Sequence, residues 1–218
     1  MAISNLTTGL RPGVCTSLTR PTAPYEGQVI YETDTDLSYV WGGSAWQQVS
    51  GGTAVGNSGL VYVKSQTVGS TTASITIDNA FSATYDNYKI IYTGGVASTT
   101  VQIRLQLSGL TANYYGSFAG TNWSTSAYYG QNDNNGPLFT WVGYGGGAAT
   151  MLHAGIFGPF STNRKYITAS QTYVFAGSAY GTYVGECALT TSTSSFILST
   201  NTGTLSGGVV IVYGYRKA

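Results

Sequence analysis

Only 8% of the 218 residues are charged, and the formal net charge is +1 at neutral pH. Without a cluster of lysine and arginine, so small a charge argues against nucleic acid and against an anionic membrane surface as the main partner. Disordered chains combine low hydrophobicity with high net charge, whereas 42% of these residues are hydrophobic and 18 are tyrosines. We therefore expect a folded chain, and its many hydroxyl and tyrosine side chains favour an all-β protein.

The first residues predict an arm followed by a small sheet. Residues 1–23 are interrupted by proline and show no apolar period, so we expect an extended N-terminal arm. Residues 24–50 predict a small three-stranded β anchor module, a β-meander with strands at 29–31, 39–41 and 46–49. A unit of this length buries too little surface to offset its chain entropy comfortably. We therefore expect it to be stabilised by packing against something else.

The remaining chain predicts a second domain behind a linker. Residues 51–59 are rich in glycine and are expected to be flexible. Over residues 60–218, short β-like runs recur between Gly, Asn and Ser at intervals that suit a sandwich. The clearest run is 101–107, in which apolar and polar residues alternate strictly. We predict a jelly-roll-like antiparallel β-sandwich with minimal helix.

The last run, 209–215, differs because apolar residues occupy both of its faces. Such a strand is expected to be buried on both sides, either centrally in the sandwich or against another subunit.

The sequence also bears on location and redox state. No stretch approaches the roughly 20 apolar residues that a membrane-spanning helix needs, and the N-terminus lacks the features of a secretion signal. We therefore expect synthesis in a cytoplasm and no membrane insertion. Cys15 and Cys187 fall in different modules, so no disulfide is inferred, and two buried free thiols are the simpler interpretation.

Patterns for catalysis or metal binding are scarce. The single histidine, His153, has apolar neighbours, which favours a packed or hydrogen-bonded structural residue over a base or a ligand. Asp34 and Asp36 lack the further ligands of a calcium loop and are expected in a turn. Residues 143–148, GYGGGA, match a dinucleotide-binding fingerprint, but no helix is expected after them, so a loop is the better interpretation.

We accordingly expect no enzyme activity, no cofactor and no metal site. An enzyme that cleaves polysaccharide would need two acidic residues facing each other in a groove. The positions of Asp86, Asp133 and Glu186 in the fold would test that possibility.

Residues 113–137 combine aromatic and amide side chains in what is expected to be an exposed loop. Tyr and Trp offer large rigid contact surfaces, and Asn and Asp offer directional hydrogen bonds, a combination that suits sugars. In the alternative, the rings pack the sheet and the amide run is a passive connection. The candidate glycan-binding residues are Tyr114, Tyr115, Trp123, Tyr128, Tyr129, Asn132, Asp133 and Asn134.

Several stretches resemble one family. The sequence RPTAPYEGQVIYETDT, followed by VWGGSAW, resembles the N-terminal segment of many tailed-bacteriophage tail fibre and virion appendage proteins. The sequences YDNYKIIYTG, VQIRLQLSG, AGIFGPFSTNRKYIT and LSGGVVIVYGYRK are similar to the β-sandwich tip domain of such fibres. Together they cover most of the chain, and residues 113–137 match least. These motifs are packing and turn signatures, so they specify architecture better than activity.

The resemblance implies a homotrimer that is made in the host cytoplasm and carried on a virion. The N-terminal arm would attach to other virion proteins, of the tail or the capsid, and the distal domain would adhere to a host surface glycan or another envelope component. A capsid-attached head fibre or decoration protein is the alternative, and a polysaccharide depolymerase is less favoured. In a trimer, the small sheets would pool aromatic side chains around the threefold axis. The expected contact residues are Tyr31, Tyr39, Trp41 and Trp46.

Overall fold

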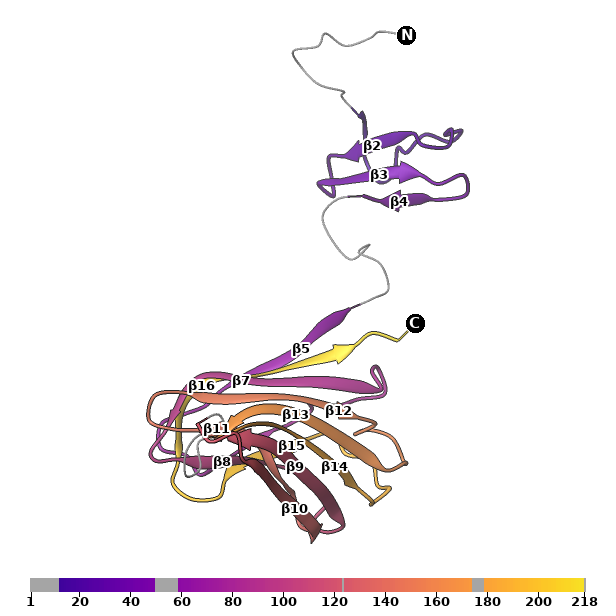
Figure 1. The fold of residues 1–218 in the computed structure, drawn as a ribbon. Helices are drawn as coiled ribbons and strands as arrows, with labels where there is room; N and C mark the ends of the chain where they lie inside the picture. Colours follow the sequence, from indigo (N-terminus) through magenta and orange to yellow (C-terminus); the bar gives the residue numbers. More distant parts are fainter. Residues whose placement is uncertain (1–11, 50–58, 123, 174–178, 218) are drawn as a thin grey trace. The chain divides into compact units, whose positions relative to one another are not determined.

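The structure, a computed structural model, describes residues 12–49, 59–122, 124–173 and 179–217. These residues form 16 β-strands and no helix, which confirms the all-β prediction for them. The chain divides into two compact units, Met1–Asn57 and Ser58–Ala218, which are coloured along the sequence in Figure 1. Most of the expected linker, residues 51–58, lies outside the described residues. In the described ranges there is no helix of the length and apolarity that a membrane crossing requires.

The first unit is a four-stranded sheet. Its strands are, in spatial order, β1 (Gly13–Cys15), β2 (Val29–Glu32), β3 (Leu37–Trp41) and β4 (Trp46–Gln48). Strand β1 runs parallel to β2, and the other pairs are antiparallel. The expected sheet had three strands, and β1 lies in residues that were expected to form an arm. Three residues are too short a run to show an alternating pattern, and β1 forms only by pairing with a strand farther along the chain.

Polar contacts organise the turns of this small sheet. Residues 33–36 form the turn between β2 and β3, and Asp36 adopts a φ of 58°, in the left-handed region that Asp tolerates. The Tyr31 hydroxyl donates to the carboxylate of Asp36, and the backbone N–H of Ser17 donates to Asp34 over 2.9 Å. The prediction that Asp34 and Asp36 are turn residues is confirmed.

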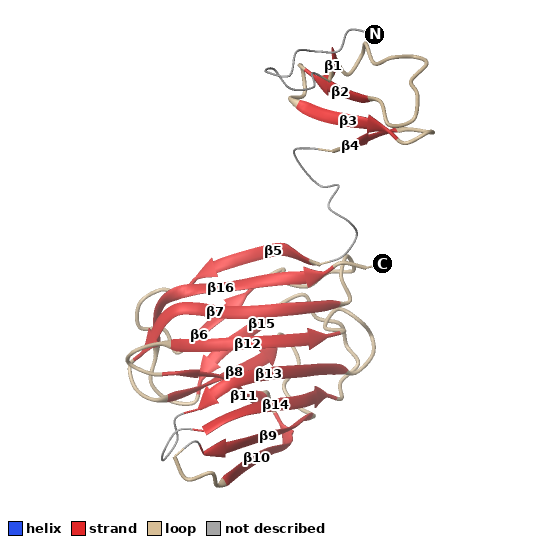
Figure 2. Ribbon diagram, turned by 45° about the horizontal axis from the view of Figure 1, so that its top comes forward, coloured by secondary structure: helices blue, strands red, loops and turns tan. Residues whose placement is uncertain are grey.

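The second unit is one continuous twelve-stranded sheet arranged in two layers. Figure 2 shows the strands of the larger layer side by side. In spatial order the larger layer consists of β5 (Leu60–Thr67), β16 (Leu205–Tyr215), β7 (Asn87–Ala97), β12 (Thr150–Phe157), β13 (Lys165–Tyr173), β14 (Ala179–Cys187), β9 (Tyr114–Asn122) and β10 (Tyr128–Gly136). The smaller layer consists of β11 (Phe139–Gly145), β8 (Val101–Leu107), β15 (Phe196–Thr200) and β6 (Ser74–Ile77). All of these pairings are antiparallel, and β11 joins the layers because it pairs with both β8 and β12.

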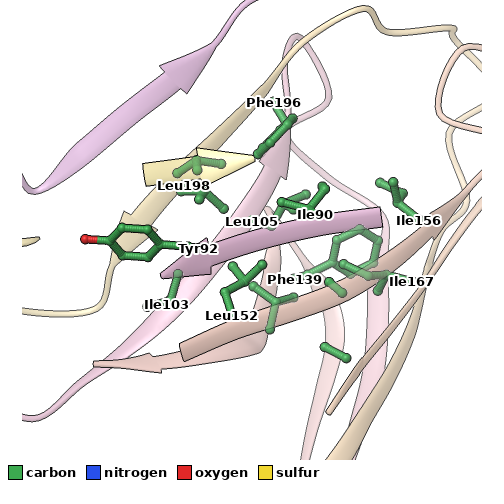
Figure 3. Packing of buried hydrophobic residues seen from close by; sticks show 14 of the residues in the cluster. Ile90, Tyr92, Ile103, Leu105, Phe139, Leu152, Ile156, Ile167, Phe196 and Leu198 are labelled. Carbon is green, nitrogen blue, oxygen red and sulfur yellow. The ribbon is translucent and has the colours of Figure 1, made fainter. Parts of the chain in front are cut away.

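The core of the second unit lies between its layers, an arrangement that is consistent with a β-sandwich. In β8, Val101, Ile103, Leu105 and Leu107 are buried while the residues between them are partly exposed, which confirms the alternation predicted for this run. Rings from the two layers meet directly, since the centroids of Tyr114 and Phe139 are 4.7 Å apart. Figure 3 shows how side chains from both layers fill the space between them.

Strand β16 lies between β5 and β7 in the larger layer, next to the edge strand β5. Its inward side chains Val210 and Val212 are buried. Those of the opposite face, including Val209 and Ile211, are only half-buried. The expectation of burial on both sides is therefore met on one face only.

The two ends of the second unit differ in what they hold. Leu60, the first residue of β5, pairs with Tyr215 of β16, and Asn87, the first residue of β7, pairs with Phe157. We call this the entry end. The opposite, far end carries the turn at 146–149 between β11 and β12. That turn contains the second half of the GYGGGA sequence, while residues 143–145 end strand β11. A strand and not a helix follows the turn, so the loop interpretation is confirmed for residues 146–148 only.

Candidate ligand-binding surfaces

The segment expected to be an exposed loop is an antiparallel hairpin at the edge of the larger layer. Strands β9 and β10 span most of residues 113–137, with Tyr128 opposite Thr121 and Asn132 opposite Ser117. The loop prediction is therefore wrong. Glycine and amide residues hide the strand pattern, and they are tolerated here because an edge strand has one unpaired side that faces water.

The hairpin separates the aromatic cluster onto two faces, because successive side chains of a strand point to opposite sides. Tyr114 faces inward and is fully buried; its hydroxyl donates to the Leu110 carbonyl over 3.1 Å and accepts from the Leu107 N–H over 3.0 Å. Burial raises the pKa of this phenol well above its ordinary value. Tyr114 is therefore a core residue, and its assignment to a ligand-binding loop is corrected.

Two further candidates on the hairpin also turn inward. The ring of Tyr129 packs edge-on against Phe118 at 6.1 Å between centroids. The carboxylate of Asp133 accepts hydrogen bonds from the hydroxyls of Tyr183 and Thr140, each over 2.7 Å. Burial, and then the neighbouring Asp133, raise the pKa of Tyr183. Asp133 thus ties β10 to β14 and β11, which is a structural role and not the exposed role expected for it.

The remaining candidates fall on the open side of the hairpin or outside it. Tyr128 is 75% exposed, and Asn132 and Asn134 are also exposed, while Tyr115 is half-buried. Trp123 lies outside the described residues.

The hairpin contributes to a larger surface that the sequence interpretation missed. Tyr180 of β14 is 55% exposed and lies opposite Thr121, whose other cross-strand neighbour is Tyr128. Ala119 and Thr182 form the next row, so small side chains fill the space between the two tyrosines. We call these five residues the outer tyrosine face. The alternation of Tyr180, Thr182 and Val184 with the buried Tyr183 was the sequence signal that could have indicated it.

A cleft of about 510 Å³ lies at the entry end of the second unit. The guanidinium of Arg164 is 2.9 Å from Glu186, and the ammonium of Lys217 is 2.8 Å from Asp86. The lining residues are Ser82, Ala83, Tyr85, Asp86, Phe157, Gly158, Phe160, Ser161, Asn163, Arg164, Tyr166 and Lys217. The cleft therefore combines aromatic walls with charges that are already paired.

A smaller hollow of about 160 Å³ lies on the other side of Phe157, on the outer face of the larger layer. Its lining includes Lys89, Gly155 and His153. His153 is exposed, because the alternation in β12 turns Leu152 and Ala154 inward. Of the two expected structural roles, packed or hydrogen-bonded, the packed one is therefore wrong. Partial burial, and then the charge of Lys89, lower the pKa of His153.

A third hollow, of about 400 Å³, lies at the far end beside the glycine-rich turn. Tyr144 and Met151 provide its larger apolar side chains, and residues 146–149 form its rim. This hollow is concave but has few polar groups that could orient a ligand, so its lining does not indicate which class of ligand would bind.

The acidic residues relevant to polysaccharide cleavage are engaged separately. Asp86 is paired with Lys217, Glu186 with Arg164, and Asp133 belongs to the Tyr183 and Thr140 network. Each carboxylate therefore has its own partner: Asp86 and Glu186 are paired separately at the entry-end cleft, and Asp133 lies in the hairpin. Within the described ranges, no three His, Cys, Asp or Glu side chains are grouped as a metal site would require.

The expected trimer contacts of the first unit also divide between two faces. The rings of Trp41 and Trp46 meet edge-on at 5.5 Å, and Tyr39 lies under the guanidinium of Arg20 at 4.4 Å, on the face that contains Ile30. Tyr31 lies on the opposite face. That second face carries four valines and is largely open, and we call it the valine face: Val14, Val29, Tyr31, Val40 and Val49.

Both cysteines are free thiols in separate units. Cys187 is buried, as expected. Cys15 is only partly buried, because β1 lies at the edge of its small sheet.

A scan against protein-family models, a search of curated proteins and a search of solved structures each found no match.

Proposed function

We propose that the protein is a bacteriophage virion appendage, a short homotrimeric fibre that adheres to host cells as a tail fibre or receptor-binding protein. The observation that carries the proposal is the outer tyrosine face. Tyr128 and Tyr180 expose their rings on paired strands, with small side chains between them. A rigid sheet holds such rings ready for contact, so little conformational entropy is lost on binding a polar surface such as a glycan.

The first unit would serve as the anchor to other virion proteins. Among its described residues, Ile30 is the only hydrophobic side chain that is fully buried, so the unit lacks a core of its own. Two further copies of the chain would cover the valine face, which supports trimerisation through this surface. The second unit would be the jelly-roll-like tip, and three tips on one fibre would raise the apparent affinity by about 10² to 10⁴ over a single contact.

A capsid-attached head fibre or decoration protein is the alternative. It is favoured by the direct succession of two sheets, with no shaft between them in the described part of the chain. A polysaccharide depolymerase is disfavoured, because Asp86, Asp133 and Glu186 are each committed to a separate partner.

The test of adhesion uses the labelled full-length protein and cell envelopes from a panel of bacterial species. We expect binding to some envelopes that is lost when periodate oxidises their sugars. Tyr128→Ala and Tyr180→Ala should each weaken it by roughly 1 to 3 kcal/mol per site, the order of magnitude known for aromatic stacking on nucleic-acid bases. Tyr62→Ala, which removes another exposed ring from the same sheet, is the matched control. Unchanged binding by both variants would contradict the role of the outer tyrosine face.

A further inference from the structure

The cleft at the entry end and the smaller hollow are neighbours, because Phe157 lines both. Phe157 lies between Asn87 of β7 and Tyr166 of β13 on the outer face of the larger layer. Its ring is 37% exposed, and that of Tyr166 is 49% exposed. We call the two together the Phe157 groove. It offers room on each side of an exposed ring, which suits a chain-like ligand with more than one unit.

The hollow exists because a glycine interrupts strand β12. Gly155 lies between Lys89 and Thr168 in the sheet. A Cβ atom there would lie 3.4 Å from Thr168 Oγ1 and 3.5 Å from the Phe157 ring, so a side chain could be accommodated at its base but would occupy the hollow. The backbone at Gly155 does not adopt a positive φ. Glycine weakens a strand, and inside a strand it often marks a bulge, a bend, or the close approach of a ligand or of another backbone. No bulge in the register is recorded at Gly155, and the space above it is the hollow.

A buried lysine fixes the loop that lines the cleft. Lys165 is completely buried, and its ammonium donates to the carbonyls of Ser161, Asn163 and Leu189 at 3.0, 2.6 and 3.2 Å. These contacts hold residues 158–164 against the core. A loop held in this way presents Asn163 and Arg164 in a defined position before a ligand arrives, which lowers the entropic cost of binding.

The charge around the groove favours an anionic ligand. The second unit contains seven Lys and Arg residues against four Asp and Glu residues, whereas the whole chain is nearly neutral. At the groove, Asp86 and Glu186 are neutralised by Lys217 and Arg164. Lys89 has no ion-pair partner among the described residues, so its charge is available at the hollow.

We propose that the Phe157 groove binds an acidic oligosaccharide, with a sugar ring against Phe157 and its acidic group directed to Lys89. This deepens the proposed function, on which it rests, by naming a glycan class and a second binding surface on the tip. Aromatic faces suit the apolar faces of sugar rings, and Asn163, Thr168 and Ser170 supply hydrogen-bonding groups around them. A peptide is less suited, because the groove lies on the face of paired strands and offers no free strand edge.

The test is calorimetric titration of the full-length protein with a panel of short acidic oligosaccharides. The panel comprises oligogalacturonate, hyaluronan fragments and oligosialic acid, each compared with its uncharged methyl ester. We expect at least one acidic member to bind about tenfold more tightly than its ester, as a hydrogen bond to a charged group would give. Gly155→Val should abolish this binding by filling the hollow, and Lys89→Met should reduce it to the level of the ester. Tyr62→Ala should bind like the original protein.

Three results would overturn the groove assignment: no member of the panel binds, binding is unaffected by both groove substitutions, or polyglutamate binds as tightly as the sugars. Melting temperatures of the variants identify any loss of folding, and Lys89→Met tests the groove even if Gly155→Val unfolds. The envelope assay separates the two proposals. If Gly155→Val adheres to envelopes normally and does not bind the panel, the groove stands as a sugar site but not as part of adhesion. If the original protein binds the panel but no envelope, adhesion fails and the groove stands.

Discussion

The two units of the chain bury apolar side chains to very different extents. The second unit has a continuous core of 30 buried residues between its layers, whereas Ile30 is the one buried hydrophobic residue among those described in the first. The first unit relies on polar contacts in its place. Glu32 has no solvent-accessible surface and is paired with Arg20, and the Thr35 hydroxyl donates to it over 2.8 Å. Hydrophobic burial is the dominant favourable term in folding, so we infer that the second unit is stable alone and the first is not.

The two units, produced as separate chains, should show the largest difference in stability. The chain starting at Ser58 should keep its strand content and unfold cooperatively in urea, because its core is complete. Residues 1–57 alone should lose their strand content on dilution, because too little apolar surface is buried in one copy. Circular dichroism over a range of concentrations measures both. A first unit that stayed folded at every concentration would show that it needs no partner.

Substitutions on the two faces of the β9–β10 hairpin should also differ strongly in their effect on the free energy of unfolding. Tyr114→Ala should lower the free energy of unfolding by roughly 3 to 5 kcal/mol, because it leaves a cavity against Phe139. Tyr128→Ala should change it by less than about 0.5 kcal/mol, since this ring is exposed. Urea titration of both variants provides the measurement, and equal losses would contradict the division of the hairpin into a core face and an open face.

Substitutions on the valine face should weaken self-association and leave the stability of the second unit unchanged. Val29→Thr and Val40→Thr together should weaken self-association, because hydroxyl groups would be buried without partners in the assembly. Light scattering at micromolar concentration should show a trimer for the original chain and lower masses for the variant. Gln47→Ser, on the same face but without an apolar side chain, is the control. A monomer mass for the original chain would refute the trimer.

Lowering the pH should change stability least of these tests, and the change should be in the first unit. Hydrogen bonding to Arg20 lowers the pKa of Glu32, and hydrogen bonding to Ser17 lowers that of Asp34. A carboxyl group whose pKa is lowered in the folded state stabilises the fold at pH values above its ordinary pKa of about 4. That stabilisation is lost as the pH falls through the pKa of the folded state. Melting curves at falling pH should therefore show the first unit destabilised below about pH 4, and Glu32→Gln should reduce this pH dependence. A first unit that is equally stable at neutral and at strongly acidic pH would contradict the stabilising role of these two carboxylates.

Local sequence patterns were enough to predict several elements. The alternation in residues 101–107 predicted β8 and its buried face, and the Asp-rich turn after β2 was recognised from its composition. The division near the glycine-rich stretch coincides with the boundary between the compact units. These features depend on the two-residue period of a strand and on turn chemistry, both of which act between near neighbours.

Tertiary structure decided which residues are available to a ligand. The sequence showed aromatic residues at 114, 115, 128 and 129, but only strand pairing determined that Tyr114 enters the core and Tyr128 does not. In the same way, β1 exists only because it pairs with β2, and the Phe157 groove exists only because Lys89, Gly155 and Thr168 come into register from three strands. The two-residue pattern of a strand shows that its side chains alternate between two faces. Which of the two faces becomes buried depends on segments far away in the chain. When both faces of a strand carry rings and polar groups, as in this hairpin, the sequence alone contains no local signal that distinguishes them.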